Sequence, residues 1–238
     1  MQLIGTKMTI KKNYFVEMDF IAKVEETGEI FDTTLESEAK KAGLFNENEK
    51  DKFKPLKVCV GQGMVVKGFD KEIEGKDTGK EYQIRLKPED AFGKRDSKLI
   101  KTMPLSAFRA RGVEPAAGMM LSLDNFLVKI SAVTSGRVIV DFNNPLSGKH
   151  IIYKFTVNNI IEDKKEQIEI LSKFFVGMES EVAVDEKRAV VRFQTKLPEK
   201  IEEEFKKKIK ETAGIESEIK SADKGEEGKI EPERPYNE

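Results

Sequence analysis

The stretch VGQGMVVKGFD, residues 60–70, contains a glycine pattern that is typical of a phosphate-binding loop. Gly63 and Gly68 have the G-x-x-x-x-G spacing of a nucleotide-binding P-loop. That motif continues with Lys and then Ser or Thr, whereas Phe69 and Asp70 follow here, and an aspartate would repel phosphate. The run between the two glycines is apolar, and the third glycine of a dinucleotide fingerprint is absent. We therefore expect this loop to be structural or to border an apolar pocket, and not to bind a nucleotide.

Two further stretches supply walls for such a pocket. GEIFDTT, residues 28–34, and KPEDAFGKRD, residues 87–96, each place an aromatic side chain beside carboxylates and a turn signal. Taken singly, aromatics such as Phe31 and Phe92 are more often core residues than site residues. Asp32 taken singly is most often a turn or cap residue. The joint occurrence of the three motifs in one chain favours a small apolar pocket.

The composition of the chain narrows the function classes. Its 238 residues include 42 Lys and Arg against 43 Asp and Glu, so nothing global indicates a nucleic-acid-binding protein. With one cysteine and one histidine, the chain has no intrachain disulfide and none of the usual zinc sites. A magnesium or calcium site built from carboxylates alone stays open, although no EF-hand spacing occurs. The sequence shows no signal peptide and no membrane helix, which predicts a soluble cytoplasmic protein without a membrane partner.

The elements expected around the three motifs form one domain that is interrupted by another. Strands are expected at residues 8–24, 30–32, 56–60 and 80–86, and a short helix is expected to begin at Phe69. After Gly93 the chain becomes basic and β-rich, with a short helix MPLSAF and the strands MMLSL, FLVKISAV and RVIVDF joined by turns at 124–125 and 135–136. The strand HIIYKFTVNNIIE then resumes the earlier pairing. Residues 94–147 are therefore predicted to be a domain inserted into another domain.

Past Asp163 the pattern predicts a third unit. It contains an amphipathic helix EQIEILSKFF, the strands SEVAV and RAVVRFQ, and a helix that begins near Pro198 and stops at Gly214. A sheet of two short strands is marginal alone and needs another layer to cover it. That cover could come from the first domain or from the same unit of a second chain, and we favour the second chain because symmetric pairing is common. The acidic residues 215–238 are predicted to be disordered.

The three motifs and the resuming strand together resemble the FK506-binding protein (FKBP) family of peptidyl-prolyl isomerases. GEIFDTT, VGQGMVVKGFDKEIEGKDTGKEYQIRLKPEDAFG and IIYKFTV occur in the family's order and spacing. The insert after AFG, with DSKLIKTMPLSAF and SGRVIVDFNNPLSGK, is similar to the insert-in-flap chaperone domain of the SlyD-type subfamily. The C-terminal unit looks like that of the long archaeal members. The resemblance covers residues 7–162, about two-thirds of the chain.

This resemblance implies an α+β fold. The fold consists of an antiparallel FKBP-type sheet wrapped on a short helix, a small β-rich inserted domain and a C-terminal α/β extension. The implied domains are the prolyl isomerase domain at residues 7–93 and 148–162, the inserted flap domain at 94–147, the C-terminal α+β domain at 163–214 and the disordered tail at 215–238.

The family's pocket, carried over position by position, is mostly apolar in this chain. The resemblance assigns to it Phe20, Phe31, Asp32, Leu56, Val65, Val66, Phe69, Phe92 and Tyr153, with Met64 beside them. Phe69 stands at the position of the family's pocket-floor tryptophan, whereas Phe20 and Phe92 replace tyrosines, so two hydroxyl groups are absent. The histidine-rich metal tail of SlyD-type members is also absent, and the resemblance implies no metal and no cofactor. Cys59 is expected to be structural, and His150 is assigned no role.

The chemistry implied by the resemblance breaks no covalent bond. Rotation about an X-Pro bond has a barrier of about 20 kcal/mol, and an apolar pocket disfavours the planar, polar amide relative to its twisted transition state. The resemblance assigns the backbone N–H that anchors a substrate carbonyl to Val66. We expect an enzyme that accelerates X-Pro rotation in unfolded or partly folded polypeptides that contain proline. The alternative is a peptide-binding holdase or adaptor with little catalysis.

Apolar side chains of the insert are expected either to form its core or to hold unfolded clients. A unit of this size cannot bury all of them, and flexible methionines suit the binding of varied segments. The candidate client-binding residues are Met64, Met103, Phe108, Met119, Met120, Leu121 and Phe126. The expected partners are thus polypeptides and, through the C-terminal domain, a second copy of the chain, with no nucleic acid.

Overall fold

The computed structural model describes residues 8–123, 126–185 and 188–221. The chain divides into two compact units. Of the described residues, those within 1–21, 32–83 and 154–238 form the first unit, and those within 22–31 and 84–153 form the second. Within the described residues, no helix is long and apolar enough to cross a membrane.

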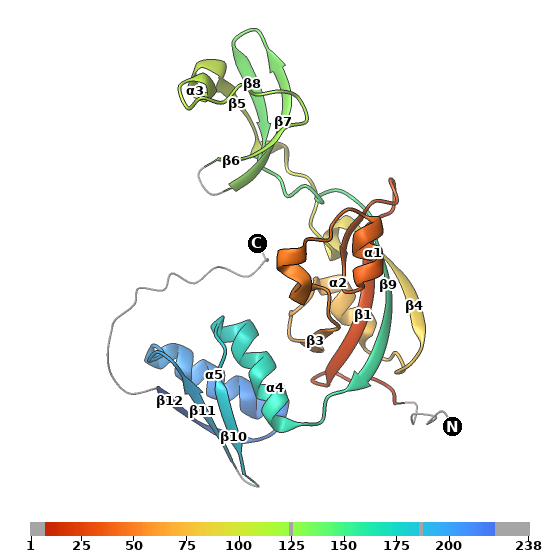
Figure 1. The fold of residues 1–238 in the computed structure, drawn as a ribbon, viewed down its shortest axis with the longest axis vertical. Coiled ribbons are helices and arrows are strands. Elements are labelled where there is room, and N and C mark those ends of the chain that lie inside the picture. Colours follow the sequence, from red (N-terminus) through yellow and green to blue (C-terminus); the bar gives the residue numbers. More distant parts are fainter. Residues whose placement is uncertain (1–7, 124–125, 186–187, 222–238) are drawn as a thin grey trace. The chain divides into compact units, whose positions relative to one another are not determined.

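The largest sheet among the described residues has five strands (Figure 1). Its strand order is β2 (Ile30–Thr33), β1 (Phe15–Val24), β9 (Ile151–Ile160) and β4 (Glu81–Leu86), and β3 (Leu56–Cys59) pairs antiparallel with β1. Every second residue of β1 from Val16 to Val24 is buried, because successive side chains of a strand point to opposite faces. The α+β class with antiparallel sheets, expected from the sequence, is confirmed.

Short helices occupy the connections of this sheet. They are α1 (Glu36–Lys41), η1 (Glu47–Lys52), α2 (Lys67–Ile73) and η2 (Pro88–Asp90). Helix α2 is the helix expected at Phe69, and it begins two residues earlier, at Lys67. Four of its seven residues are buried, among them Phe69 and Asp70.

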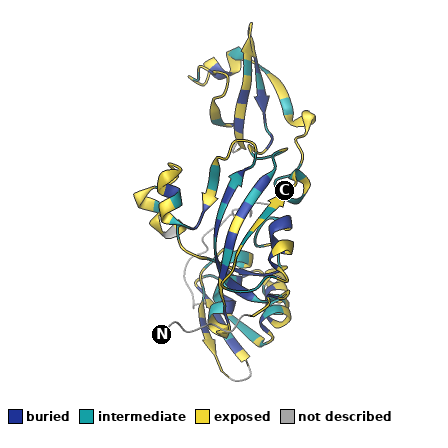
Figure 2. Cartoon of the chain, turned by 90° about the vertical axis from the view of Figure 1, so that its right-hand side faces the viewer, coloured by how far each residue is buried: buried dark blue, intermediate teal, exposed yellow. Residues whose placement is uncertain are grey.

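The insert carries a separate four-stranded antiparallel sheet in the order β5-β8-β7-β6. Its elements are η3 (Ser97–Leu99), β5 (Ile100–Pro104), α3 (Leu105–Arg109), β6 (Met120–Leu123), β7 (Phe126–Thr134) and β8 (Arg137–Asp141). The core of this sheet consists of Phe108, Leu123, Val128, Ile130, Val138 and Val140. Exposed and buried segments alternate along its strands (Figure 2). The turn expected at residues 124–125 lies outside the described residues.

The insert leaves and rejoins the chain at one point, which we call the neck and define as Gly93 and Gly148. The backbone N–H of Gly148 donates to the carbonyl of Gly93 at 2.8 Å, and the hydroxyl of Ser147 donates to the carbonyl of Phe92 at 3.0 Å. Both neck glycines have positive φ, 79° and 78°, which glycine adopts without a steric penalty. The two ends of the insert are therefore already adjacent.

A buried carboxylate stiffens the insert next to the neck. Asp141 accepts from the side-chain amide of Asn143 at 2.7 Å, and Arg95 pairs with its other oxygen. The same Asn143 amide donates to the carbonyl of Asp96 at 2.9 Å. Burial raises the pKa of Asp141, but the Asn143 and Arg95 donors outweigh that effect and hold the pKa below its usual range.

Within its described residues, the C-terminal unit contains three strands, whereas two were expected. Its elements are α4 (Lys164–Leu171), a π-helical turn η4 (Ser172–Val176), β10 (Glu181–Val184), β11 (Arg188–Phe193), α5 (Glu199–Ala213) and β12 (Glu216–Ser221). Strand β12 pairs parallel with β11, and α5 supplies the crossover that a parallel pair requires. The prediction that residues 215–238 are disordered is therefore wrong for β12, whereas 222–238 lie outside the described residues, as do residues 1–7.

The core of the C-terminal unit includes residues of the first domain. Phe15 of β1 and Cys59 of β3 belong to the same buried cluster as Leu171, Phe193 and Ile209. Ile209 and Leu171 are fully buried there, so the C-terminal unit has cover within its own chain. The preference for a second chain as the necessary cover is thus wrong: the third strand and the contact with β1 and β3 complete the layer.

Candidate functional site

The glycine loop, residues 61–66, is held by an aspartate. The backbone N–H groups of Gly61 and Gly63 donate to the two carboxylate oxygens of Asp70 at 2.7 and 2.9 Å. Both glycines have positive φ, 80° and 69°, so their N–H groups can converge on one anion. The carboxylate of Asp70 thus accepts from the turn amides that would face a phosphate in a P-loop.

Helix α2 begins at the end of this loop and presents an aromatic ring to the sheet. Phe69 is 1% exposed, and its ring packs edge-on against Phe20 at 6.1 Å and Phe155 at 5.0 Å between centroids. Such edge-to-face pairs are favourable beyond the area that they bury. Phe69 therefore lies in the wall between the helix and strands β1 and β9.

Asp32 lies at the end of β2, next to two buried threonines. Thr33 donates its hydroxyl to the carbonyl of Phe20 at 2.8 Å, and the backbone N–H of Phe20 donates to the hydroxyl of Thr34 at 2.9 Å. Part of Asp32 stays exposed, but loss of hydration raises the pKa of its carboxyl group, and a hydrogen bond from the Thr33 backbone only partly offsets this. Ionised Asp32 is therefore less favourable in the folded chain than in water.

The remaining pocket candidates fall into two groups. In the first unit, Leu56 lies opposite Met18 in the β3–β1 pair, and Val65 and Val66 precede α2; all three candidates are half-buried. In the second unit, Phe31 and Phe92 pack edge-on at 5.6 Å. Tyr153 of β9 is 5% exposed. The structure thus joins Phe20 to Phe69 and, separately, Phe31 to Phe92.

Comparisons with known proteins bear on this arrangement. The family model "FKBP-type peptidyl-prolyl cis-trans isomerase" matches residues 6–107, and the model "FKBP26, IF domain" matches residues 101–146. A "short-type peptidyl-prolyl cis-trans isomerase" of Methanocaldococcus jannaschii is 33% identical over 148 residues, which are 62% of this chain and 90% of that protein. The chain belongs to the FKBP-type peptidyl-prolyl cis-trans isomerases. The family recognised in the sequence is therefore confirmed.

SlyD proteins are further relatives of this isomerase. The SlyD of Pasteurella multocida is 30% identical over 119 residues, and that of Escherichia coli is 29% identical over 119 residues. Each alignment covers 48% of this chain, and the chain spans 59% and 60% of the length of the two SlyD proteins. The SlyD-like relationship expected from the insert is thereby supported.

Met64 of the isomerase makes contacts within its own chain that do not suit its predicted client-binding role. Its sulfur accepts the backbone N–H of Cys59 at 3.1 Å, and its side chain packs against the C-terminal cluster that includes Cys59 and Phe15. Burial raises the pKa of the Cys59 thiol to about 12, with a further contribution from the charge of Asp70. Met64 and Cys59 thus belong to the contact between the glycine loop and the C-terminal unit.

The candidate client-binding residues of the insert divide by exposure. Phe108 is 2% exposed and belongs to the core, so its client-binding role is ruled out in this conformation, and Met103 and Leu121 pack partly against that core. The side chains that stay exposed are Met119, Met120 and Phe126, the last at 64%. Leu127, at 58%, was not predicted. Its signal was the pair of adjacent apolar residues at the start of β7, because successive side chains of a strand point to opposite faces and one of the two must face away from the core of the insert.

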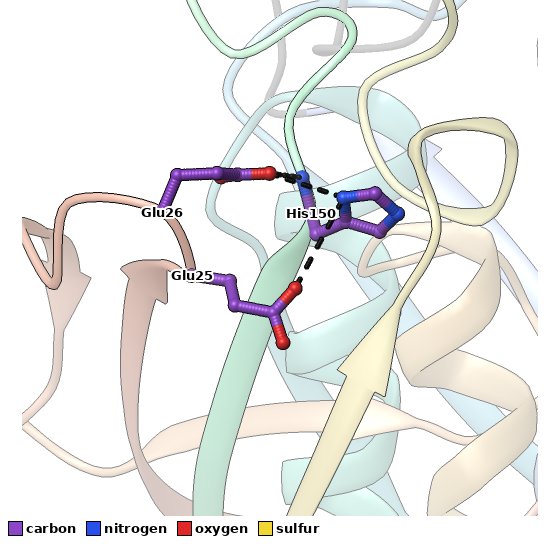
Figure 3. A group of neighbouring side chains, drawn as sticks. All are labelled: Glu25, Glu26 and His150. Carbon is purple, nitrogen blue, oxygen red and sulfur yellow. Dashed lines mark hydrogen bonds and ion pairs between the residues drawn. The ribbon is translucent and has the colours of Figure 1, made fainter.

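Glu25, Glu26 and His150 gather at the surface of the isomerase, as Figure 3 shows. The Nε of Arg85 donates to both oxygens of Glu25 at 2.7 and 2.8 Å, and this bond lowers the pKa of Glu25. Nδ1 of His150 lies 3.0 Å from Glu26, whose pKa is lowered by its own backbone N–H and by His150. These carboxylates already have donors. The group therefore ties the β1–β2 turn to the start of β9, although the ligand types would suit a metal.

Proposed function

We propose that the isomerase uses an apolar pocket built from Phe20, Phe31, Asp32, Leu56, Val65, Val66, Phe69, Phe92 and Tyr153. The observation that supports it is the pair of aromatic contacts, Phe20 with Phe69 and Phe31 with Phe92, in the stretch matched by the family model. The substrates are proline-containing polypeptides in unfolded or partly folded states. The enzyme acts in the cytoplasm.

In the proposed mechanism, the pocket favours the twisted amide over the planar one. The amide dipole shrinks as the X-Pro bond rotates, so an apolar wall destabilises the ground state more than the transition state. The backbone N–H of Val66 binds a substrate carbonyl and holds the bond in place. A thousandfold acceleration needs about 4 kcal/mol of such differential binding. No covalent step and no proton transfer to a side chain is needed.

Replacement of Phe92 by alanine tests the pocket. The variant loses one wall, and we expect kcat/KM for a tetrapeptide with a Phe-Pro bond to fall tenfold or more, which is about 1.4 kcal/mol of transition-state stabilisation. The measurement is a protease-coupled isomerisation assay. Phe126→Ala is the matched control, since Phe126 is 64% exposed on the insert and a tetrapeptide fills only the pocket.

Two results of that assay would count against the proposal. Parental turnover by a folded Phe92→Ala variant would remove Phe92 from the pocket. A purified parental protein that binds unfolded chains but does not accelerate tetrapeptide isomerisation would favour the holdase or adaptor alternative.

We also infer that the insert binds clients through its exposed apolar side chains. Met119, Met120 and Phe126 are all at least 40% exposed, and Leu127 lies beside Phe126. Exposed apolar groups on a small domain indicate an interaction surface. The insert would hold a chain near the pocket. We propose that residues 94–147 form the domain with this binding role and that catalysis belongs to the prolyl isomerase domain.

The C-terminal unit is proposed to pair two chains, although it has cover within its own chain. A hollow of about 240 Å³ opens between η4 and α5, lined by Phe175, Val176, Ile201, Glu204, Phe205 and Lys208. Phe175 and Ile201 are 37% and 39% exposed. Exposed apolar side chains around such a hollow suit a symmetric contact between two copies of the chain.

Light scattering tests the pairing. We expect the full chain to have the mass of a dimer at tens of micromolar, and a chain that ends near Asp163 to have the mass of a monomer. An Ile201→Asp variant should also be monomeric, because it places a charge in an apolar contact. A monomeric mass for the full chain would refute the dimer and leave the isomerase unaffected.

A further inference from the structure

A hydrogen-bonded chain links the glycine loop to helix α5 of the C-terminal unit. The amide nitrogen of Gln62 donates to the side-chain oxygen of Asn13 at 2.7 Å, and the amide oxygen of Gln62 accepts from the ammonium of Lys208 at 2.9 Å. The amide nitrogen of Asn13 donates in turn to the carbonyl of Glu211 at 3.3 Å. Gln62 thus has a donor and an acceptor contact, and both lead to α5, one directly and one through Asn13.

Asn13 has an unusual backbone conformation at this point. Among the described residues it is the one non-glycine with positive φ, 67°. Residues other than glycine are rarely left-handed, although asparagine tolerates it best. The backbone N–H of Asn13 also donates to the carbonyl of Val60, directly before the loop, at 2.9 Å. Asn13 therefore contacts the glycine loop at two points, while its side chain reaches α5.

The lysine at the other end of the link is itself held. Lys208 is half-buried, and its ammonium lies 5.1 Å from the centre of the Phe175 ring, a cation–π distance. Met64 of the same loop packs against the buried C-terminal cluster, which includes Phe205 and Ile209 of α5. Helix α5 therefore contacts the loop both by apolar packing and by the hydrogen bonds around Gln62.

We propose that Gln62 and Lys208 are positioning residues for the isomerase, through which helix α5 holds the loop 61–66 in its productive conformation. The proposal rests on the proposed assignment of Val65 and Val66 to the pocket. Glycines on both sides of Gln62 make the loop intrinsically mobile, and Asp70 fixes only its backbone at Gly61 and Gly63. A misplacement of a binding group by about 1 Å is enough to slow an enzyme.

Lys208→Met tests the link, because methionine keeps an apolar stem and removes the ammonium. We expect kcat for a tetrapeptide to fall about three- to tenfold with a smaller change in KM, since an unrestrained loop spends less time in the productive conformation. Lys208→Arg should restore the rate, because it keeps donors toward the Gln62 oxygen. Lys207→Met is the matched control: Lys207 is the neighbouring residue of α5, its side chain is 78% exposed, and its partner is Glu211 at 3.9 Å.

The reactivity of Cys59 distinguishes a positioning role of Gln62 and Lys208 from detachment of the C-terminal unit. Cys59 is 0% exposed in the contact between β3 and that unit, so its reaction with a thiol reagent reports opening of the contact. We expect Gln62→Ala and Lys208→Met to lower kcat while Cys59 stays as protected as in the parent. Parental kinetics in both variants, or a loss of activity that rises in parallel with Cys59 reactivity, would overturn the proposal. If the pocket assignment itself is wrong, the Phe92→Ala variant should isomerise the tetrapeptide at the parental rate.

Discussion

Phe69→Ala should strongly destabilise the isomerase. The ring is 1% exposed and packs against Phe20 and Phe155, so its removal leaves a cavity between α2 and the sheet. A buried Phe→Ala change costs about 3–5 kcal/mol, a large part of the total stability of a domain. Denaturant unfolding should show this loss as a lower midpoint. The folded fraction should also isomerise a tetrapeptide at least tenfold more slowly.

The same Phe→Ala change at Phe126 provides the comparison. Because Phe126 is 64% exposed, we expect its removal to alter the free energy of unfolding by no more than about 0.5 kcal/mol. If Phe69→Ala unfolds at the same denaturant concentration as Phe126→Ala, then the Phe69 ring does not pack between α2 and the sheet. A destabilised Phe69→Ala protein with parental turnover would show that the ring has a structural role alone.

Removal of the insert should separate two activities of the chain. A short loop in place of residues 94–147 should leave the prolyl domain folded, since Gly93 and Gly148 are already joined by a 2.8 Å hydrogen bond. Tetrapeptide turnover should then stay close to the parental rate. Catalysed refolding of a proline-limited protein should slow about tenfold or more, because the client loses the effective concentration that binding to the insert provides.

A surface variant of the insert is the control for that deletion. Serine in place of Met119, Met120 and Phe126 leaves the core of the insert intact and removes the exposed apolar groups. We expect it to slow refolding as the deletion does. Equal refolding rates with and without the insert would refute the chaperone role. Slow refolding in the deletion but not in the surface variant would place client binding elsewhere on the insert.

Elements with strong local signals could be predicted from the sequence. Helix α5 begins after Pro198 and ends at Gly214, whose φ is 70°, because proline suits a helix start and glycine suits a left-handed helix end. Strand β12 was missed for the opposite reason. Its sequence, ESEIKS, is polar and short, and it is held mainly by backbone pairing with β11. Composition indicates whether a segment can bury apolar area, but not whether a neighbouring strand has backbone groups available for pairing with it.

Contacts between distant residues account for the rest of what was missed at the candidate site. Asp70 was recognised as hostile to phosphate, but its bonds to Gly61 and Gly63 depend on the turn between strand and helix. Cys59 was expected to be structural, and it is. The sequence signal for this was the apolar run from Val58 to Val60, and all three of its residues are buried. Consecutive burial means that both faces of a strand are covered, and here the second cover is the C-terminal unit.

The neck at Gly93 and Gly148 also couples the stabilities of the two domains that it joins. While the insert is unfolded, the prolyl domain must close a loop of more than fifty residues in order to fold, an entropic cost of roughly 3–4 kcal/mol. A folded insert brings its own ends together and removes most of that cost. The insert thus acts on the prolyl domain as a covalent cross-link of about that strength, and any partner that keeps the insert folded also stabilises the catalytic domain.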